Sequence, residues 1–169
     1  MKIVWNELLK YAVVGNLLHL FFSLIYSFIR DGSSRLSIGF TVLMLLMYTI
    51  IGFVYSTRGE SKRESHFLTL GLITTLPMII FLVLSQILDS LEGLSAIQDY
   101  ILFYIIGAPT IFWHRPFEPI MNFFSNSSIY IQLDINVAVV IFFLFIGGYI
   151  GLIWSKVKKS KAGRIVNKK

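Results

Sequence analysis

Uncharged stretches of the chain are separated by short charged segments, and four of these stretches are long enough to cross a bilayer. They run over residues 11–29, 36–57, 67–88 and 135–155, and each contains 19 to 22 residues. A helix rises about 1.5 Å per residue, so the shortest of them covers about 28 Å, close to the thickness of a hydrocarbon core. The pattern therefore predicts four transmembrane helices.

A proline interrupts the third of these stretches. Pro77 follows Thr74 and Thr75, and threonine hydroxyls can bond to the backbone carbonyls that a proline leaves without a partner. We expect a local kink at this point.

A fifth apolar stretch, residues 100–113, has only 14 residues and contains Gly107 and Pro109. It is short for a span, and its proline favours a bend. Lengthening it into a fifth span would place Asp99 inside the bilayer. We interpret residues 89–134 as an external segment whose apolar middle lies at the interface, re-enters the membrane or folds over the bundle.

Lysine and arginine fall unevenly on the two sides of these spans. With four spans and the N-terminus inside, 12 basic residues lie on the cytoplasmic side and 3 on the outer side. A five-span arrangement gives at best 9 against 6, and basic residues favour the cytoplasmic side. We expect four spans in a plasma membrane with both termini cytoplasmic. The small size and the lack of cysteine favour a bacterial membrane.

The composition agrees with a membrane protein and excludes a water-soluble domain. Apolar residues make up 56% of the 169 residues, charged residues 14%, and the mean hydropathy is +0.74. A soluble chain of this length needs charged positions along every helix to cover its surface. We expect an all-α fold, with residues 1–155 as one four-helix transmembrane bundle and residues 156–169 as a basic tail.

Four polar residues fall on one face of the first span. Asn16, His19, Ser23 and Tyr26 follow the spacing i, i+3, i+7 and i+10, which aligns them along a helix. Such a face contacts protein or water rather than lipid. It serves either as hydrogen-bonding contact between helices or as a solute pathway in which His19 relays protons. No Asp, Glu, Lys, Arg or His occurs in the other spans, which argues against an ion-coupled transporter.

Small residues cluster in the last span. Gly147, Gly148 and Gly151 contain a G-x-x-x-G pattern, which lets another helix approach closely. That helix belongs either to this chain or to a second copy or partner subunit. The sequence shows no heptad run and no internal repeat.

The C-terminal tail is basic and contains no acidic residue. Each basic side chain near an anionic leaflet contributes about 1 kcal/mol to membrane binding, so we expect the tail to contact anionic phospholipid. No aromatic residues are interleaved with the basic ones, and no nucleic-acid partner is expected. The basic residues are Lys156, Lys158, Lys159, Lys161, Arg164, Lys168 and Lys169.

One turn gathers side chains suited to chemistry. His114, Arg115 and Glu118 lie between prolines, as a candidate base, cation and acid or as two metal ligands. A metal site needs three or four ligands, however, and His19 and His66 are placed at other depths. No Walker loop, G-x-S-x-G, H-E-x-x-H or dinucleotide fingerprint occurs, and without cysteine there is no thiolate. We expect neither an enzyme nor a metal or cofactor site.

These observations lead to one main hypothesis and one alternative. The main hypothesis is a non-enzymatic membrane protein of accessory, regulatory or protective type, which acts through contacts with lipid and with a membrane-protein partner or a second copy. The alternative is a small-solute channel or transporter subunit that uses the polar face of the first span.

Overall fold

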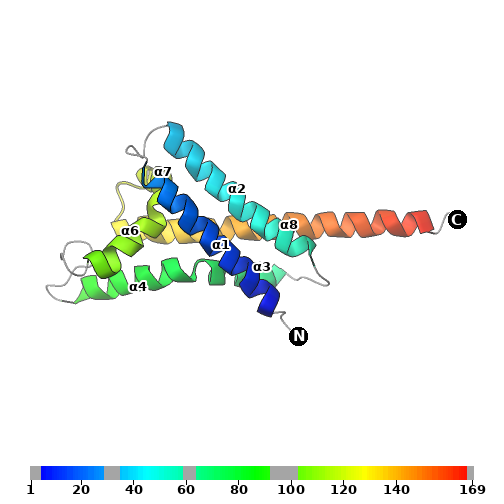
Figure 1. The fold of residues 1–169 in the computed structure, drawn as a ribbon, viewed down its shortest axis with the longest axis horizontal. Coiled ribbons are helices and arrows are strands. Elements are labelled where there is room, and N and C mark those ends of the chain that lie inside the picture. Colours follow the sequence, from blue (N-terminus) through cyan, green and yellow to red (C-terminus); the bar gives the residue numbers. More distant parts are fainter. Residues whose placement is uncertain (1–4, 29–34, 59–63, 92–102, 167–169) are drawn as a thin grey trace.

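The computed structural model describes residues 5–28, 35–58, 64–91 and 103–166. Every regular element among them is helical, which confirms the all-α prediction for this part of the chain. The three longest helices are α1 (Trp5–Tyr26), α2 (Arg35–Thr57) and α8 (Ile129–Val166). Figure 1 shows α8 running through the molecule with the other helices packed along its first half, while its C-terminal part projects beyond them.

Three helices are long and apolar enough to cross a membrane: α1, α2 and residues Ile129–Ser160 of α8. The bent pair of α3 (Glu64–Thr74) and α4 (Leu76–Ser90) adds a fourth if the two helices form one span. Length and composition thus give three to four candidate spans among the described residues.

The boundaries of the predicted spans agree best for α2. The prediction of residues 36–57 differs from α2 by one residue, whereas α1 begins six residues before residue 11 and ends at Tyr26. The largest difference is at α8, which covers 38 residues or about 57 Å. The basic tail therefore begins as a continuation of this helix, since it contains no proline to end it.

The predicted kink in the third stretch is present. α3 and α4 meet at Thr75 with an angle of 55° between them, and Pro77 lies in the first turn of α4. The Thr75 hydroxyl donates to the carbonyl of Gly71 over 2.9 Å, and the Thr75 backbone N–H donates to the same carbonyl, so the hydroxyl adds a second bond beside the break.

The contact between α2 and α8 is the most extensive one between helices. Buried residues on both helices recur at alternating steps of four and three, the spacing of a left-handed helix pair. On α2 they are Ser37, Thr41, Met44, Tyr48, Ile51 and Tyr55, and on α8 they are Leu133, Val137, Val140, Leu144, Gly147 and Gly151. The 3.5-residue repeat is hidden in the sequence because the outward positions are apolar as well.

Glycines bring the backbones of α2 and α8 into direct contact. A side-chain carbon added at Gly147 would overlap the carbonyl of Thr49, and one at Gly52 would overlap the carbonyl of Leu144. Because neither glycine has a side chain, the two helices lie closer together here than larger residues allow.

The other two glycines of the pattern also face helices of the same chain. A carbon added at Gly148 would come within 2.5 Å of the Phe67 ring of α3, and one at Gly151 within 2.7 Å of the Phe53 carbonyl of α2. In this structure the G-x-x-x-G face is occupied by the chain's own helices.

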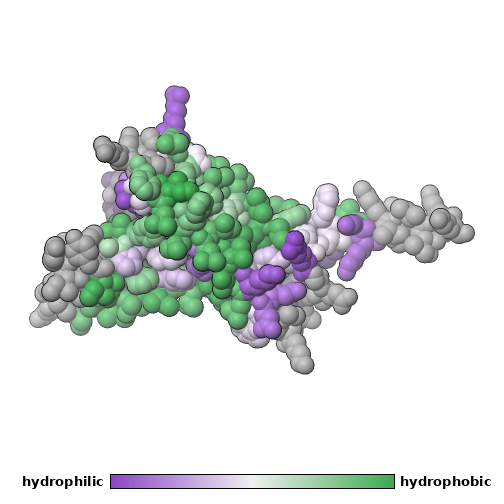
Figure 2. Space-filling model, viewed as in Figure 1, coloured by the Kyte–Doolittle hydropathy of each residue, from purple (hydrophilic) through white to green (hydrophobic). Residues whose placement is uncertain are grey.

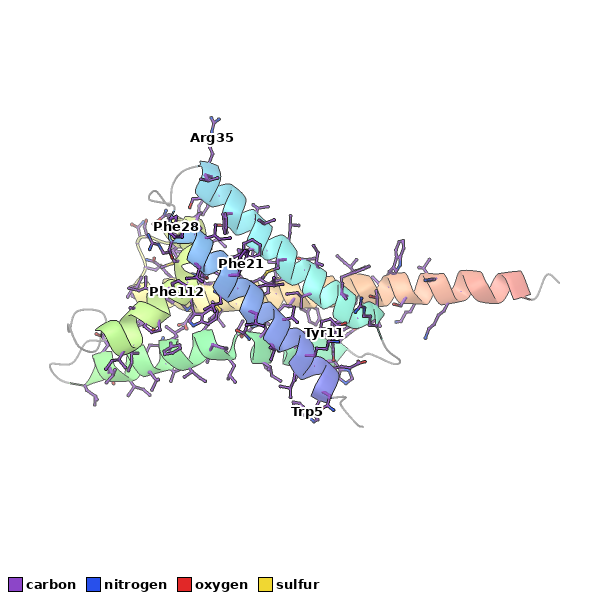
Figure 3. The ribbon with its side chains drawn as sticks, in the orientation of Figure 1. Trp5, Tyr11, Phe21, Phe28, Arg35 and Phe112 are labelled. Carbon is purple, nitrogen blue, oxygen red and sulfur yellow. The ribbon has the colours of Figure 1, made fainter. Side chains whose placement is uncertain are left out.

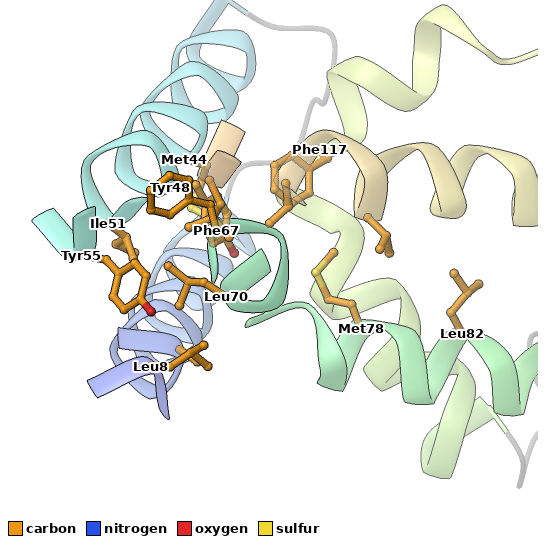
Figure 4. Close-up of a cluster of buried hydrophobic side chains, with 14 of the residues drawn as sticks. Leu8, Met44, Tyr48, Ile51, Tyr55, Phe67, Leu70, Met78, Leu82 and Phe117 are labelled. Carbon is orange, nitrogen blue, oxygen red and sulfur yellow. The ribbon is translucent and has the colours of Figure 1, made fainter. Parts of the chain in front are cut away.

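The interior is rich in aromatic and aliphatic side chains, and so is the outer surface. Tyr48, Tyr55 and Phe67 lie in the core between α2, α3 and α8 (Figure 4). Figure 2 shows apolar surface over α1 and α2, with hydrophilic residues gathered near the helix ends. Leu17, Ile50 and Phe142 are each more than half exposed. This outward distribution of large apolar side chains suits a lipid environment.

We expect the substitution Gly147→Ala to destabilise the fold, because its methyl group cannot fit against the Thr49 carbonyl. Overpacking of this kind costs about 1–3 kcal/mol. The measurement is the free energy of unfolding, or the melting temperature, of purified protein in detergent.

Gly39→Ala serves as the matched control, since nothing lies within 4 Å of the added carbon at Gly39. It should be neutral or slightly stabilising. Equal stability losses in the two variants would contradict the close approach of α2 and α8.

Candidate functional site

Short helices fill the described part of the segment between α4 and α8. They are the π-helical turn η1 (Phe103–Gly107), α6 (Ala108–His114), the 3-10 turn η2 (Arg115–Phe117) and α7 (Glu118–Phe123). A proline stands in the first turn of α6, η2 and α7, where its missing N–H costs nothing and its fixed φ favours a new helix. None of these helices is long enough to cross a bilayer, and residues 92–102 lie outside the described part.

The beginning of α6 is fixed to α4. The Thr110 hydroxyl lies 2.9 Å from that of Ser85 and 2.7 Å from the carbonyl of Ile106. Tyr130 of α8 donates to the carbonyl of Ser85 over 3.2 Å. Both Thr110 and Ser85 are fully buried, so this contact anchors α6 in the interior.

The end of α6 is fixed to the middle of α1. His19 Nε2 lies 2.8 Å from the carbonyl oxygen of Trp113, and His19 Nδ1 lies 2.6 Å from the Tyr48 hydroxyl of α2. A carbonyl can only accept, so Nε2 carries the proton, and Nδ1 of the neutral ring accepts from Tyr48. The Trp113 ring stacks on His19 with 4.6 Å between centroids. Both nitrogens of His19 are thereby used in contacts between helices.

Two further contacts attach η2 to α2 and α7 to α1. Thr41 of α2 donates to the carbonyl of Pro116 over 2.7 Å. Tyr26 of α1 donates to a carboxylate oxygen of Glu118 over 3.4 Å and also contacts the Ser37 hydroxyl. The segment from Thr110 to Glu118 is therefore bonded to α1, α2 and α4.

The four polar residues of the first span do not act as one group. His19 and Tyr26 reach the short helices, and Ser23 is fully buried without a hydrogen bond from its hydroxyl among the described residues. Asn16 is only partly buried and donates to the carbonyl of Ala12 in its own helix over 3.0 Å. The structure thus brings three of the four inward.

A pocket lies between the short helices and the start of α8, with a volume of about 250 Å³. All three residues of the candidate chemical turn line it: His114, Arg115 and Glu118. The remaining wall is apolar and consists of Ile111, Met121, Ile129 and Leu133. The pocket therefore joins two charged groups and an imidazole to a hydrophobic wall.

His114 is the least accommodated polar side chain of this pocket. It is 1% exposed, and neither ring nitrogen has a hydrogen-bond partner among the described residues. Burial, with a smaller effect of the neighbouring His19, lowers the pKa of His114 to about 3. The ring is neutral at pH 7, and its buried donor and acceptor are both unused, which is costly inside a protein.

The described residues do not form a metal centre. No three His, Cys, Asp or Glu side chains in this part of the chain lie close enough together to hold an ion. His66 is buried on α3 and does not line the pocket.

The basic side chains that the structure describes in the tail are Lys156, Lys158 and Lys159, and all three are exposed. The helix continues through the positions of Lys161 and Arg164, whose side chains are not described. Lys168 and Lys169 lie outside the described residues.

Sequence reasoning did not find the partners of His19. Tyr48 is one of several polar residues on α2 at helical spacing, with Ser37, Thr41 and Tyr55, and this second polar face is visible in the sequence. The carbonyls of Trp113 and Pro116 leave no trace in a sequence, since every residue has a carbonyl.

Comparison of the chain with protein-family models, curated proteins and solved structures found no match.

We expect Tyr48→Phe to lower the free energy of unfolding by about 1 kcal/mol, because it removes the hydroxyl that donates to His19. The measurement is unfolding of the protein in detergent. Tyr149→Phe on the exposed face of α8 is the control and should leave stability unchanged. The bond to His19 has no structural role if both variants unfold alike.

Proposed function

We propose that this chain is a non-enzymatic multi-pass membrane protein of accessory or regulatory type. It acts through contacts of its lipid-facing helices with lipid and with other membrane proteins. The observation that carries the proposal is the distribution of side chains. Large apolar residues face outward along α1, α2 and α8, while polar groups in the interior form bonds between helices, as His19 does with Tyr48 and Thr110 with Ser85. That arrangement favours a membrane-embedded scaffold.

In this proposal α1, α2, the α3–α4 pair and α8 are the four spans, and the segment from η1 to α7 re-enters the membrane from the outer side. The bond between His19 and Trp113 supports the re-entry. His19 lies seven residues before the end of α1, about 10 Å along the helix, so Trp113 is held well below that end. An irregular backbone at this depth is tolerated only when protein surrounds it.

In this proposal both termini lie on the cytoplasmic side of a plasma membrane. Trp5 marks one end of α1, whereas Phe28 and Arg35 lie at the opposite end of the helical body (Figure 3). Trp154 is exposed just before Lys156, as expected of an aromatic residue at an interface beside basic residues.

The geometry gives less support to a channel along the first span. Both nitrogens of His19 are engaged in bonds between helices, and the side-chain nitrogen of Asn16 bonds within its own helix. A solute pathway along this face needs polar groups that are free to change partners.

Reporter fusions test the topology. Fusions after Lys62, Ser125 and Lys169 should report cytoplasmic, external and cytoplasmic positions, because basic residues are retained inside. The protein should also stay in the membrane fraction in alkaline carbonate. Labelling of the C-terminus by an impermeant reagent in intact cells is the result that contradicts this topology.

Photo-crosslinking in native membranes tests whether the protein contacts other membrane proteins. A benzoylphenylalanine placed at Phe142, which is 57% exposed, should form an adduct with another membrane protein or a second copy. The same residue at Phe117, which is fully buried, is the control and should give none. If Leu17, Ile50 and Phe142 all yield lipid adducts alone, the accessory function is wrong.

A further inference from the structure

The pocket beside α6 combines features of a binding site. It contains a half-buried cation, Arg115, and a half-buried carboxylate, Glu118, three residues apart on η2 and α7. The Tyr26 hydroxyl lies 3.4 Å from a carboxylate oxygen of Glu118. Among the described residues the Arg115 side chain has no hydrogen bond or ion pair, and the Glu118 side chain has only its long bond to Tyr26.

His114 contributes a buried imidazole without a hydrogen bond to the wall of the pocket. The residue is 1% exposed, and each ring nitrogen exposes less than 1 Å² and has no partner in the described part of the chain. An unused donor costs free energy, and a ligand reaches this one only if the side chains around it move.

The charges of the pocket restrict the ligand. Arg115 selects an acidic group, since a guanidinium matches phosphate or carboxylate oxygens in pairs. Glu118 disfavours a ligand whose only charge is negative and favours an ammonium next to the acid. A purely anionic ligand is attracted by Arg115 but repelled by Glu118, so its net binding energy is small.

The apolar walls of the pocket restrict the chemistry of the ligand further. Ile111 and Ile129 are 37% and 39% exposed at the border of the pocket, while Leu133 is buried. An apolar border admits an apolar body attached to the charged group. The volume of about 250 Å³ holds a group of modest size.

We propose that this pocket binds a zwitterionic amphiphile, with Arg115 on its acidic group, Glu118 on its ammonium and the apolar wall on its body. Two sources supply this chemistry: the phosphoethanolamine headgroup of a membrane lipid, and a free apolar amino acid such as leucine. For the membrane lipid the proposal also rests on the membrane placement proposed above. For the free amino acid it does not.

Native mass spectrometry of the full chain in detergent tests the proposal. The probes are dihexanoyl phosphatidylethanolamine, dihexanoyl phosphatidylglycerol and leucine, each titrated separately. We expect saturable binding of the ethanolamine lipid or of leucine, and binding of the anionic glycerol lipid at least about tenfold weaker. The lipid and leucine titrations distinguish the two sources.

Variants that remove one charge each locate the site. Arg115→Gln should weaken binding of the zwitterion about tenfold, because a charge-assisted hydrogen bond is lost. Glu118→Gln should reduce the preference for the zwitterion over the anionic lipid by a similar factor. Melting curves of both variants check that the fold is intact.

Matched controls lie on exposed positions. Arg35 projects from the end of α2 (Figure 3), Asp134 is exposed on α8, and neither residue lines the pocket. Arg35→Gln and Asp134→Asn should leave binding unchanged.

Three results overturn the proposal: no saturable binding of either zwitterion, equal binding of the anionic lipid by the unaltered protein, or Arg115→Gln indistinguishable from Arg35→Gln. Because binding is measured on purified protein and topology by fusions in cells, failure of the site and failure of the proposed function are separate outcomes.

Discussion

The direct backbone contact between α2 and α8 is the constraint on which the rest of the structure depends. It exists because Gly52 and Gly147 leave no side chain between the two helices. In lipid, apolar side chains gain little by leaving their surroundings, so close packing and hydrogen bonds must hold helices together. In the same helix, Gly148 packs against the Phe67 ring of α3, and Gly151 packs against the backbone of α2 at Phe53.

The sequence allowed prediction of the helical class, of the candidate spans and of the kink at Pro77, because long uncharged runs and prolines leave strong local signals. It did not reveal which face of α2 or α8 is buried. An amphipathic helix shows its buried face by polar residues on the other side, but here both Met44, which is buried, and Leu43, which is exposed, are apolar. In such helices the small and polar residues, such as Gly147 and Thr41, are the better guide.

The candidate site was foreseen only in part. The turn with His114, Arg115 and Glu118 stands out in the sequence because charged residues are rare there. Its surroundings do not, because Leu133 and Ile129 join it from a distant helix, and no local pattern encodes that contact. Likewise His19 was recognisable as a polar residue in an apolar helix, whereas its acceptor is a backbone carbonyl.

The bonds of the interior and the geometry of the pocket are linked through two adjacent residues. His19 holds the carbonyl of Trp113, and the next side chain, His114, lines the pocket. α6 has seven residues, too few to keep a position without tertiary contacts, so α1 and α2 set the place of His114 through His19 and Tyr48. A shift of α1 against α2 would therefore move the pocket wall, and ligand binding would in turn favour one arrangement of these two helices.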